Sequence, residues 1–337
     1  MRKSIIAAGL LIAGLAGSAA HAHQWGCWIQ ADRNVKIRNA SGGSQAASAI
    51  SDWNSMTILN FSYVSSGEET YVFNANSGAT GWGGIARITN YSGCTILRAT
   101  DQVNTYYYSG SSVAARGVHC QEIGHTFGLD HSNDGGCMGG GYWYDISTHY
   151  RPVSHNVNDV GTMYANRVAG NSALPLVGPE ADAPRIHAYW VNNPRSLRET
   201  TRLASDVVVA TVTNVADGAP IPNTARAGAS AIPTQRVSFD VISSRKGSLV
   251  ENESFVLFQN GNDANRFDED PSYKVGHSYV LFLTPRKDGT YLVVSPQGRY
   301  EITEKGLAPA AQDGFAAGLK GASLEDVILD VARAIAE

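Results

Sequence analysis

The sequence lacks the features that would point to nucleic acid or membranes as partners. It has no basic block, and its 337 residues carry a formal net charge of −4. Beyond the first 22 residues it contains no apolar run long enough to span a bilayer. We therefore expect no nucleic acid and no membrane span, and we expect protein or peptide substrates as partners.

The chain begins with a stretch typical of a secretory signal peptide, MRKSIIAAGLLIAGLAGSAAHA. A basic start is followed by the apolar run Ile5–Ala16, and Ala20 with Ala22 fits an A-x-A cleavage site. Cleavage there would leave His23 at the new N-terminus of a secreted or periplasmic protein. The alternative is a membrane anchor, for which the run is short and rich in glycine.

Cysteines are few, and none has the C-x-x-C spacing typical of metal-binding thiols. The four are Cys27, Cys94, Cys120 and Cys137. An even number in a secreted chain indicates two disulfides, for which three pairings are open. We favour Cys27–Cys94 with Cys120–Cys137, because the second bond would tie a predicted helix to the loop that follows it.

Composition changes across residues 169–184, a run of Pro, Gly and Ala without periodicity that we interpret as a linker. It separates a first domain, 23–168, from a second, 185–337. Lys36 is the single lysine of the first domain, whereas lysines return in the second. The length of the chain is also more natural for two domains than for one.

In the first domain the predicted order is strand, helix, several strands, helix, loop and helix. The middle helix covers 111–128, where Ser111 or Ser112 caps the start and Gly128 ends the helix. The other helices are predicted over 44–56 and 156–168. Strands are predicted over 34–40, 61–66, 70–75, 84–89 and 95–100.

The second domain is rich in β-type runs at intervals typical of a small barrel or sandwich. These runs cover 205–215, 235–244, 253–260, 278–285 and 291–303. The tail predicts an amphipathic C-terminal helix whose start is capped by Ser323 and Asp326. We find no cluster of catalytic residue types in this domain.

The stretch VHCQEIGHTFGLDH concentrates the residues that carry chemistry. Gln121 and His125 are four residues apart and therefore share one face of the predicted helix. Glu122 lies next to them and can reach a water on a metal held there. Gly128 allows the chain to leave the helix through a left-handed turn, so that His131 returns to the same metal.

This stretch resembles the extended zinc motif H-E-x-x-H-x-x-G-x-x-H of metzincin-type metalloproteases. Met138 and the later HNVNDVGTMY extend the likeness, which is closest to the matrixin-like bacterial branch. The resemblance implies an α+β fold with a twisted, mostly parallel sheet, an active-site helix and a cleft. It implies that His125 and His131 bind Zn²⁺, that Glu122 is the general base and that Met138 is the turn methionine. Gln121 stands at the first-ligand position. Structural Ca²⁺ is compatible with the family, but no motif here predicts it.

Gln121 departs from the family pattern, because a neutral amide oxygen is a poorer zinc ligand than imidazole. Three alternatives follow: Gln121 ligates weakly, an outside ligand or extra water completes the site, or no metal binds. His119 would point away, about 200° around the helix. His149 and His155 lie in a later loop that can approach the metal. His23, as a free N-terminus, is a further chelator with no evident neighbour.

Two functions follow from these residues. The chain is a secreted zinc-dependent endopeptidase, or it is a metzincin-like protein that binds extended peptides without cutting them. The stretch 80–88, TGWGGIARI, is either the cleft edge that pairs with substrate backbone or an ordinary strand. The second domain weakly resembles the OB-like barrel of tissue inhibitors of metalloproteases. This likeness raises the hypothesis that 183–337 docks at the cleft; the simpler interpretation is an accessory domain without a role there.

Overall fold

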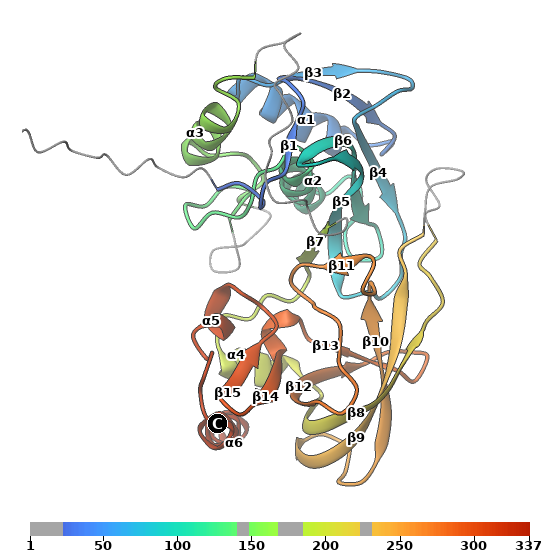
Figure 1. Cartoon of the computed structure of the whole chain (residues 1–337), viewed down its shortest axis with the longest axis vertical. Coiled ribbons are helices and arrows are strands. Elements are labelled where there is room, and N and C mark those ends of the chain that lie inside the picture. The colour runs from blue at the N-terminus through green and yellow to red at the C-terminus, as the bar shows by residue number, and fades with distance from the viewer. Residues whose placement is uncertain (1–22, 140–147, 168–184, 223–230) are drawn as a thin grey trace, which may run out of the picture.

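The structure is a computed structural model that describes residues 23–139, 148–167, 185–222 and 231–337. The predicted signal peptide and linker lie outside these ranges. In Figure 1 the helices and sheet of the first half form the upper part, the second half forms the lower part, and β7 and β11 lie between them. Within the described ranges no helix has the length and apolarity to cross a membrane.

The fold is α+β. Its helices are α1 (Ser44–Met56), α2 (Val113–Thr126), α3 (Ser154–Met163), α4 (Leu197–Leu203), α5 (Gly314–Ala317) and α6 (Leu324–Ala336), with a 3-10 turn, η1 (Pro296–Gly298). The first sheet contains β1 (Ile29–Gln30), β2 (Asn34–Asn39), β3 (Asn60–Tyr63), β4 (Thr70–Ala75), β5 (Trp82–Ser92), β6 (Thr95–Asn104), β7 (Arg185–Trp190) and β11 (Arg266–Phe267). The second sheet contains β8 (Asp206–Asp217), β9 (Thr234–Lys246), β10 (Ser254–Asn260), β12 (Ser278–Pro285), β13 (Tyr291–Val293), β14 (Arg299–Thr303) and β15 (Gly306–Pro309).

The first sheet is mixed, with the strand order β11-β7-β5-β6-β4-β2-β3 and β1 beside β6. The pairings among β1, β2, β3, β4 and β6 are parallel. β5 runs antiparallel to both its neighbours, β6 and β7. This antiparallel strand lies beside the candidate site described below.

The helices of the first half pack on one another over a shared core. The apolar positions Ala46, Ala49, Ile50 and Trp53 recur at helical spacing on α1, and all four side chains are buried. The indole of Trp53 donates a hydrogen bond to the carbonyl oxygen of Cys120 on α2, at 2.8 Å. Truncation of such a buried aromatic residue to alanine costs about 3–5 kcal/mol, so this contact fixes α2 firmly.

Two disulfides link distant parts of the first half. They are Cys27–Cys94 and Cys120–Cys137, with sequence separations of 67 and 17, and this is the pairing that the sequence favoured. The second bond joins α2 to the loop that follows it. That loop carries His131, so the disulfide restrains both segments that bear the motif.

The second sheet closes into a barrel, because β13 pairs with both β10 and β12. β8 is buried on both faces: Val208, Ala210 and Val212 belong to the barrel core, whereas Val207 and Val209 pack with residues of α4 and α6. Burial on both faces explains why the sequence of β8 is a continuous apolar run instead of an alternating one.

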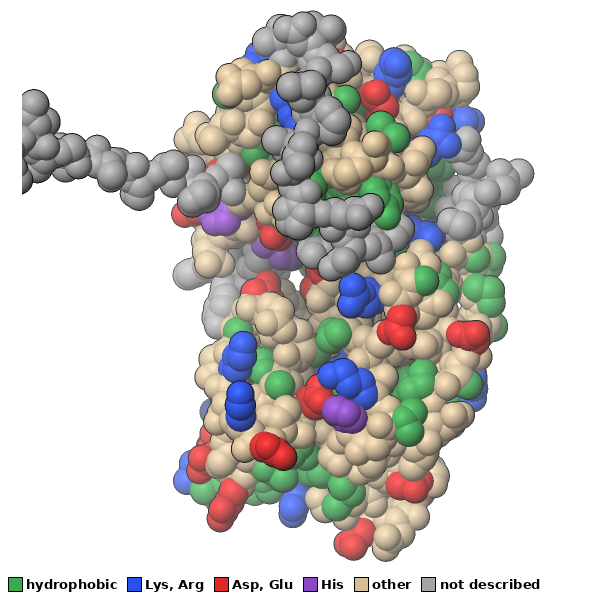
Figure 2. Space-filling view, in the orientation of Figure 1, with side chains coloured by type: hydrophobic (Ala, Val, Ile, Leu, Met, Phe, Trp, Pro, Cys, Tyr) green, Lys and Arg blue, Asp and Glu red, His purple; other side chains and the backbone are tan. Residues whose placement is uncertain are grey.

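Several predicted elements of both halves have modified bounds. The predicted run 291–303 divides into β13 and β14, with η1 between them, and the helix predicted over 156–168 is α3, Ser154–Met163. The C-terminal helix is confirmed as α6, and Ser323 Oγ accepts a hydrogen bond from Asp326 N at 3.1 Å. Basic and acidic side chains are interspersed on the lower half of the face in Figure 2, without a patch of one sign.

Two strands of the second half lie in the first sheet, so the boundary between the sheets does not coincide with the predicted linker. β7 pairs antiparallel with β5, placing Ala188 opposite Ile85 and His187 opposite Ala86. β11 pairs in parallel with β7. β7 has apolar neighbours on both faces. Ile186 packs near Trp82, whereas Tyr189 packs with residues of α2 and β6. The second half therefore reaches the helix that bears the motif.

Candidate metal centre

The active-site helix predicted from the sequence is α2. Its N-cap is Ser112, whose Oγ accepts a hydrogen bond from Ala115 N at 3.1 Å. All residues of Gly117–Thr126 are buried, and the helix contacts β5, β6 and β7. Both Glu122 and His125 are therefore held in the interior, beside the part of the first sheet that β5 and β7 form.

Gly128 ends this helical segment with a positive φ of 96°. A Cβ at this position would lie 2.1 Å from the carbonyl oxygen of Trp28, so only glycine fits. The turn also brings the carbonyl oxygen of Leu129 to 2.8 Å from His125 Nδ1. Since a carbonyl only accepts, Nδ1 carries the proton and the lone pair of His125 Nε2 is available to a metal. Nε2 is buried and has no hydrogen-bond partner among the described residues.

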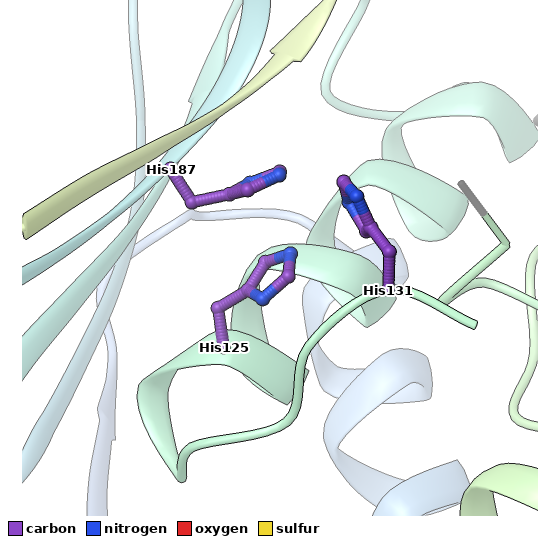
Figure 3. A group of neighbouring side chains, drawn as sticks. All are labelled: His125, His131 and His187. Carbon is purple, nitrogen blue, oxygen red and sulfur yellow. The ribbon is translucent and has the colours of Figure 1, made fainter. Parts of the chain in front are cut away.

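Three histidines converge at this point: His125 of α2, His131 of the following loop and His187 of β7. Figure 3 shows their side chains directed toward one another. One potential ligand atom from each lies within 4.8 Å of the other two. The ring centroids are 3.8 Å apart for His125 and His187, and 4.5 Å apart for His131 and His187. Three imidazoles form a ligand set typical of catalytic zinc.

His187 was not predicted from the sequence. The second half contributes this one histidine to a group whose other two members belong to the first half. His187 lies 65 residues after Glu122. In the sequence its one signal is a histidine within the short alternating run RIHAYW, directly after the predicted linker. No spacing rule connects that run with the motif, because β-sheet pairing brings them together.

Gln121 lies in the same site, but a third imidazole is present beside it. Its Nε2 is 3.0 Å from His131 Nε2, which makes it a hydrogen-bond donor to that ring. Its Oε1 is buried and has no hydrogen-bond partner among the described residues. Gln121 therefore lines the site. His187 is an imidazole and so a stronger zinc ligand than the Gln121 amide, and it stands where the sequence left open an outside ligand.

Glu122 is fully buried, and its Oε2 lies 3.3 Å from His187 Nδ1. Burial raises the pKa of the Glu122 carboxyl well above its ordinary value, and the nearby carboxyls of Asp101 and Glu269 act in the same direction. Hydrogen bonds from the backbone amides of Tyr189 and Ala86 act in the opposite direction. A bound cation would also favour the carboxylate, so this residue is adapted to exchange a proton.

Residues of the second half and of the N-terminal segment enclose the three rings. Glu269 Oε1 lies 3.1 Å from His187 Nε2, and Asp313 Oδ2 lies 3.8 Å from His131 Nδ1. Trp25 packs against His187 at a ring distance of 6.3 Å, and its indole donates to Asp268 at 2.6 Å. The centre is thus built from both halves of the chain.

The protonation of the imidazoles suits a metal. Burial lowers the pKa of His125 and of His187 well below the ordinary histidine value, and the neighbouring rings lower both further. Both rings are therefore neutral at physiological pH, which is the form that ligates a cation.

Met138 lies beneath α2, at the position that the resemblance implied for the turn methionine. A Cβ at Gly124 would lie 2.3 Å from Met138 Sδ, so the sulfur packs against the backbone next to His125. The carbonyl of Met138 accepts a hydrogen bond from Ser132 N at 2.8 Å. Met138 thus supports both the helix and the loop that bear two of the histidines.

β5, the strand expected to edge a substrate cleft, is paired along this edge with the protein's own β7. A cavity of about 50 Å³ remains beside the rings, lined by residues that include Gln121, His131, Tyr189 and Glu269. Such a volume holds one or two waters and is far too small for a peptide. Residues of the second half contact two of the three histidines.

The remaining histidines named in the sequence analysis lie elsewhere. His119 points away as expected: its Nδ1 is 2.7 Å from Asp101 Oδ2 and its Nε2 is 3.0 Å from Asn74 Oδ1. His155 does not approach the centre and instead lies beside His23. His23 therefore has a neighbour that the sequence did not reveal.

No protein-family model matches the chain, and no curated protein matches it. The assignment of this centre accordingly rests on its geometry: the convergence of His125, His131 and His187 and the buried Glu122 beside them. This arrangement can hold a divalent metal and can move a proton next to it.

Proposed function

We propose that the chain is a secreted zinc-dependent endopeptidase of the metzincin type that β7 keeps latent. The single observation that carries the proposal is the convergence of three buried or partly buried imidazoles next to the Glu122 carboxyl. The two disulfides are in keeping with an extracellular protein. The sequence motif E-x-x-H-x-x-G-x-x-H supports the same class.

The residues have distinct roles in this proposal. His125, His131 and His187 hold the metal in the latent form. A bound zinc ion would polarise the scissile carbonyl and lower the pKa of a water molecule. Glu122 accepts the proton of the attacking water at Oε2 and delivers it to the leaving amine. A raised pKa suits this exchange, because a base that is too weakly basic cannot take up the proton.

The latent state follows from the position of β7. An extended substrate binds by adding a strand to a free sheet edge, and β7 occupies that edge of β5 from Trp82 to Arg87. The same strand inserts His187 into the centre. Release of β7 would free the edge and one ligand position together, and Gln121, which lines the same cavity, would then offer its amide oxygen to the vacated position.

A second function is a structural zinc site that fastens the two halves together. It is favoured by the small cavity of about 50 Å³ and by the contact of His187 with Glu122 at 3.3 Å, which would leave no open position if the carboxylate also ligated. The two functions differ in one respect: only the first predicts cleavage when β7 is loosened.

The test loosens β7 with Ala188→Pro, which removes the amide that donates to Glu269 and places a proline inside a paired strand. Ala188→Gly is the matched control, because it changes the side chain at the same position but retains the amide. The zinc-loaded full chain is incubated with denatured protein substrates, with and without a chelator, and zinc per chain is counted. A loss of about 1.4 kcal/mol of docking free energy would raise the population of the open form about tenfold.

We expect Ala188→Pro to cleave at least about tenfold faster than the wild type and the glycine control, in keeping with that population shift. Chelation and Glu122→Ala should each abolish this cleavage. The double variant Gln121→His, His187→Ala should retain three imidazoles while removing the side chain that ties β7 to the centre, and it should also cleave faster than the wild type. Zinc binding without cleavage in both Ala188→Pro and the double variant would exclude the peptidase and support the structural site.

A further inference from the structure

A second group of metal-binding side chains lies at the N-terminal end of the described chain. His23 Nδ1 is 2.8 Å from His155 Nε2, His155 Nε2 is 3.2 Å from Asp159 Oδ2, and His23 Nδ1 is 3.3 Å from the same oxygen. We propose that His23, His155 and Asp159 bind a divalent transition-metal ion of the zinc class. The proposal does not depend on the peptidase activity.

The distances match a shared cation. Bonds of about 2.0–2.2 Å in a tetrahedral site put the ligand atoms about 3.3–3.5 Å apart. The three donor atoms already form a triangle whose sides are 2.8, 3.2 and 3.3 Å. A metal requires only a small expansion of this triangle, with no rearrangement of the backbone.

Hydrogen bonding alone does not satisfy this group. His155 Nε2 lies close to His23 Nδ1, to Asp159 Oδ2 and also to Asp134 Oδ2, the last at 3.2 Å. One imidazole nitrogen has either one proton or one lone pair, so it makes one good hydrogen bond. Three partners within 3.3 Å exceed that capacity, whereas a cation at the centre of the group would engage every donor atom once. Asp134 Oδ2 then lies beside the metal as a further oxygen.

The backbone holds these side chains in place. His155 and Asp159 are four residues apart on α3, so they share one face of the helix. The carbonyl oxygen of His23 accepts a hydrogen bond from Asp130 N at 2.8 Å, and Gln24 forms a β-bridge with Leu129. The N-terminal segment is thereby paired with the loop after α2 and presents its histidine to α3.

The donor set selects the class of metal. Two imidazoles and a carboxylate suit zinc and neighbouring transition metals, whereas calcium and magnesium prefer sites made of oxygen atoms alone. Asp159 is largely buried, with 10% of its side chain exposed, whereas 42% of His23 and 35% of His155 remain exposed. The ion would therefore be anchored on the carboxylate side and reachable from solvent on the histidine side.

The N-terminal segment that carries His23 also supports the first centre. Trp25, two residues after His23, packs edge-on against His125 at a ring distance of 5.5 Å. Trp25 N also donates to the carbonyl oxygen of Gly128 at 2.8 Å. A metal that ties His23 to α3 would thus restrain the tryptophan that covers the buried histidines.

The experiment counts zinc per chain in the full protein, after chelator treatment, reloading and removal of free metal. We expect two zinc ions in the wild type, one in His155→Ala, one in His131→Ala and none in the double variant. Asp159→Asn should weaken the second equivalent at least about tenfold, because it removes the charge but not the shape of the ligand. The matched control is His277→Ala, an exposed histidine that contacts a carboxylate, Glu301, at 2.6 Å.

The experiment measures metal content and not cleavage, so its result does not depend on the proposed peptidase activity. His131→Ala tests the second site even when the first is lost, and circular dichroism verifies that each variant is folded. The His277 variant should retain two ions. An unchanged count in folded His155→Ala, or no ion in folded His131→Ala, would show a hydrogen-bonded cluster only and overturn the proposal.

Discussion

The two histidine groups differ in burial and in the parts of the chain that build them. His125 and His187 are fully enclosed, and their group combines a helix, a loop and a strand from both halves. His23 and His155 retain solvent contact, and their group combines the N-terminal segment with one helix. Burial makes the first group costly to disturb, because an unpaired polar atom inside the protein loses its hydration. The exposed group can lose a ligand at little cost to folding.

Both groups depend on the loop between α2 and α3. Substitutions in this loop are therefore the most direct test of how the two groups differ. This loop carries His131 for the first group and Asp134 for the second, and it is joined to α2 through Cys137. Changes at its start should damage both groups. Changes at its individual side chains should damage only one.

The largest effect is expected for Gly128→Ala. The added Cβ would meet the carbonyl oxygen of Trp28 at 2.1 Å, in a left-handed conformation. Backbone strain and overpacking together should cost about 3–5 kcal/mol of unfolding free energy. Urea denaturation measures the loss. Gly135→Ala is the control, because its φ of 85° is also positive but its Cβ would meet nothing within 4 Å, and it should cost only about 1 kcal/mol. Equal losses in the two variants would contradict the steric explanation.

Removal of the Cys120–Cys137 disulfide should have the next largest effect. The bond closes a loop with a sequence separation of 17, for which chain entropy predicts about 3 kcal/mol of stabilisation. The paired alanine variant should unfold at lower denaturant concentration and bind zinc more weakly at both groups. Loss of Cys27–Cys94, with a separation of 67, should cost about 1 kcal/mol more. A stable variant that retains both zinc affinities would show that packing alone positions the loop.

Glu269→Gln should weaken only the first group. The carboxyl contacts His187 Nε2 at 3.1 Å and accepts from Ala188 N at 3.3 Å, so it orients the ring. Loss of such a supporting carboxylate typically weakens metal binding about 10–100-fold. Competition with a zinc chelator measures the change. Glu301→Gln, which alters the carboxylate beside exposed His277, should leave the affinity unchanged; an equal decrease there would indicate a nonspecific charge effect.

The smallest effect is expected for Asp134→Asn in the second group. The Asp134 side chain is 54% exposed and contacts His155 at 3.2 Å, so water screens much of its charge. We expect the second zinc ion to bind less than about tenfold more weakly, and the first to be unaffected. Titrating zinc into the variant that combines Asp134→Asn with His131→Ala measures the binding of the second ion alone. A complete loss of the second ion would make Asp134 a principal ligand instead of a supporting one.

Local patterns predicted much of the first half. The helix over Ser44–Met56 and the cap at Ser112 follow from apolar spacing and hydroxyl chemistry within a few residues. The return of His131 toward His125 follows from the turn at Gly128. Such features depend on neighbours in the sequence, and one chain suffices to reveal them.

The remaining part of the site depends on pairing between distant segments. His187 becomes a candidate ligand only because β7 aligns with β5 so that it lies opposite Ala86. β7 has six residues, and it belongs by sequence to the half that forms the barrel. His23 and Asp159 are 136 residues apart and meet because the N-terminal segment pairs with the loop after α2. No periodicity in the sequence encodes either meeting.

The pairing of β5 with β7 also bears on solubility. Without β7, one side of β5 would present unpaired amides and carbonyls along the stretch from Trp82 to Ile88, which has no charge except Arg87. Such an edge recruits strands from other chains and promotes aggregation. An activator that displaces β7 would therefore have to supply another strand at once, and a bound substrate would serve as that temporary cover.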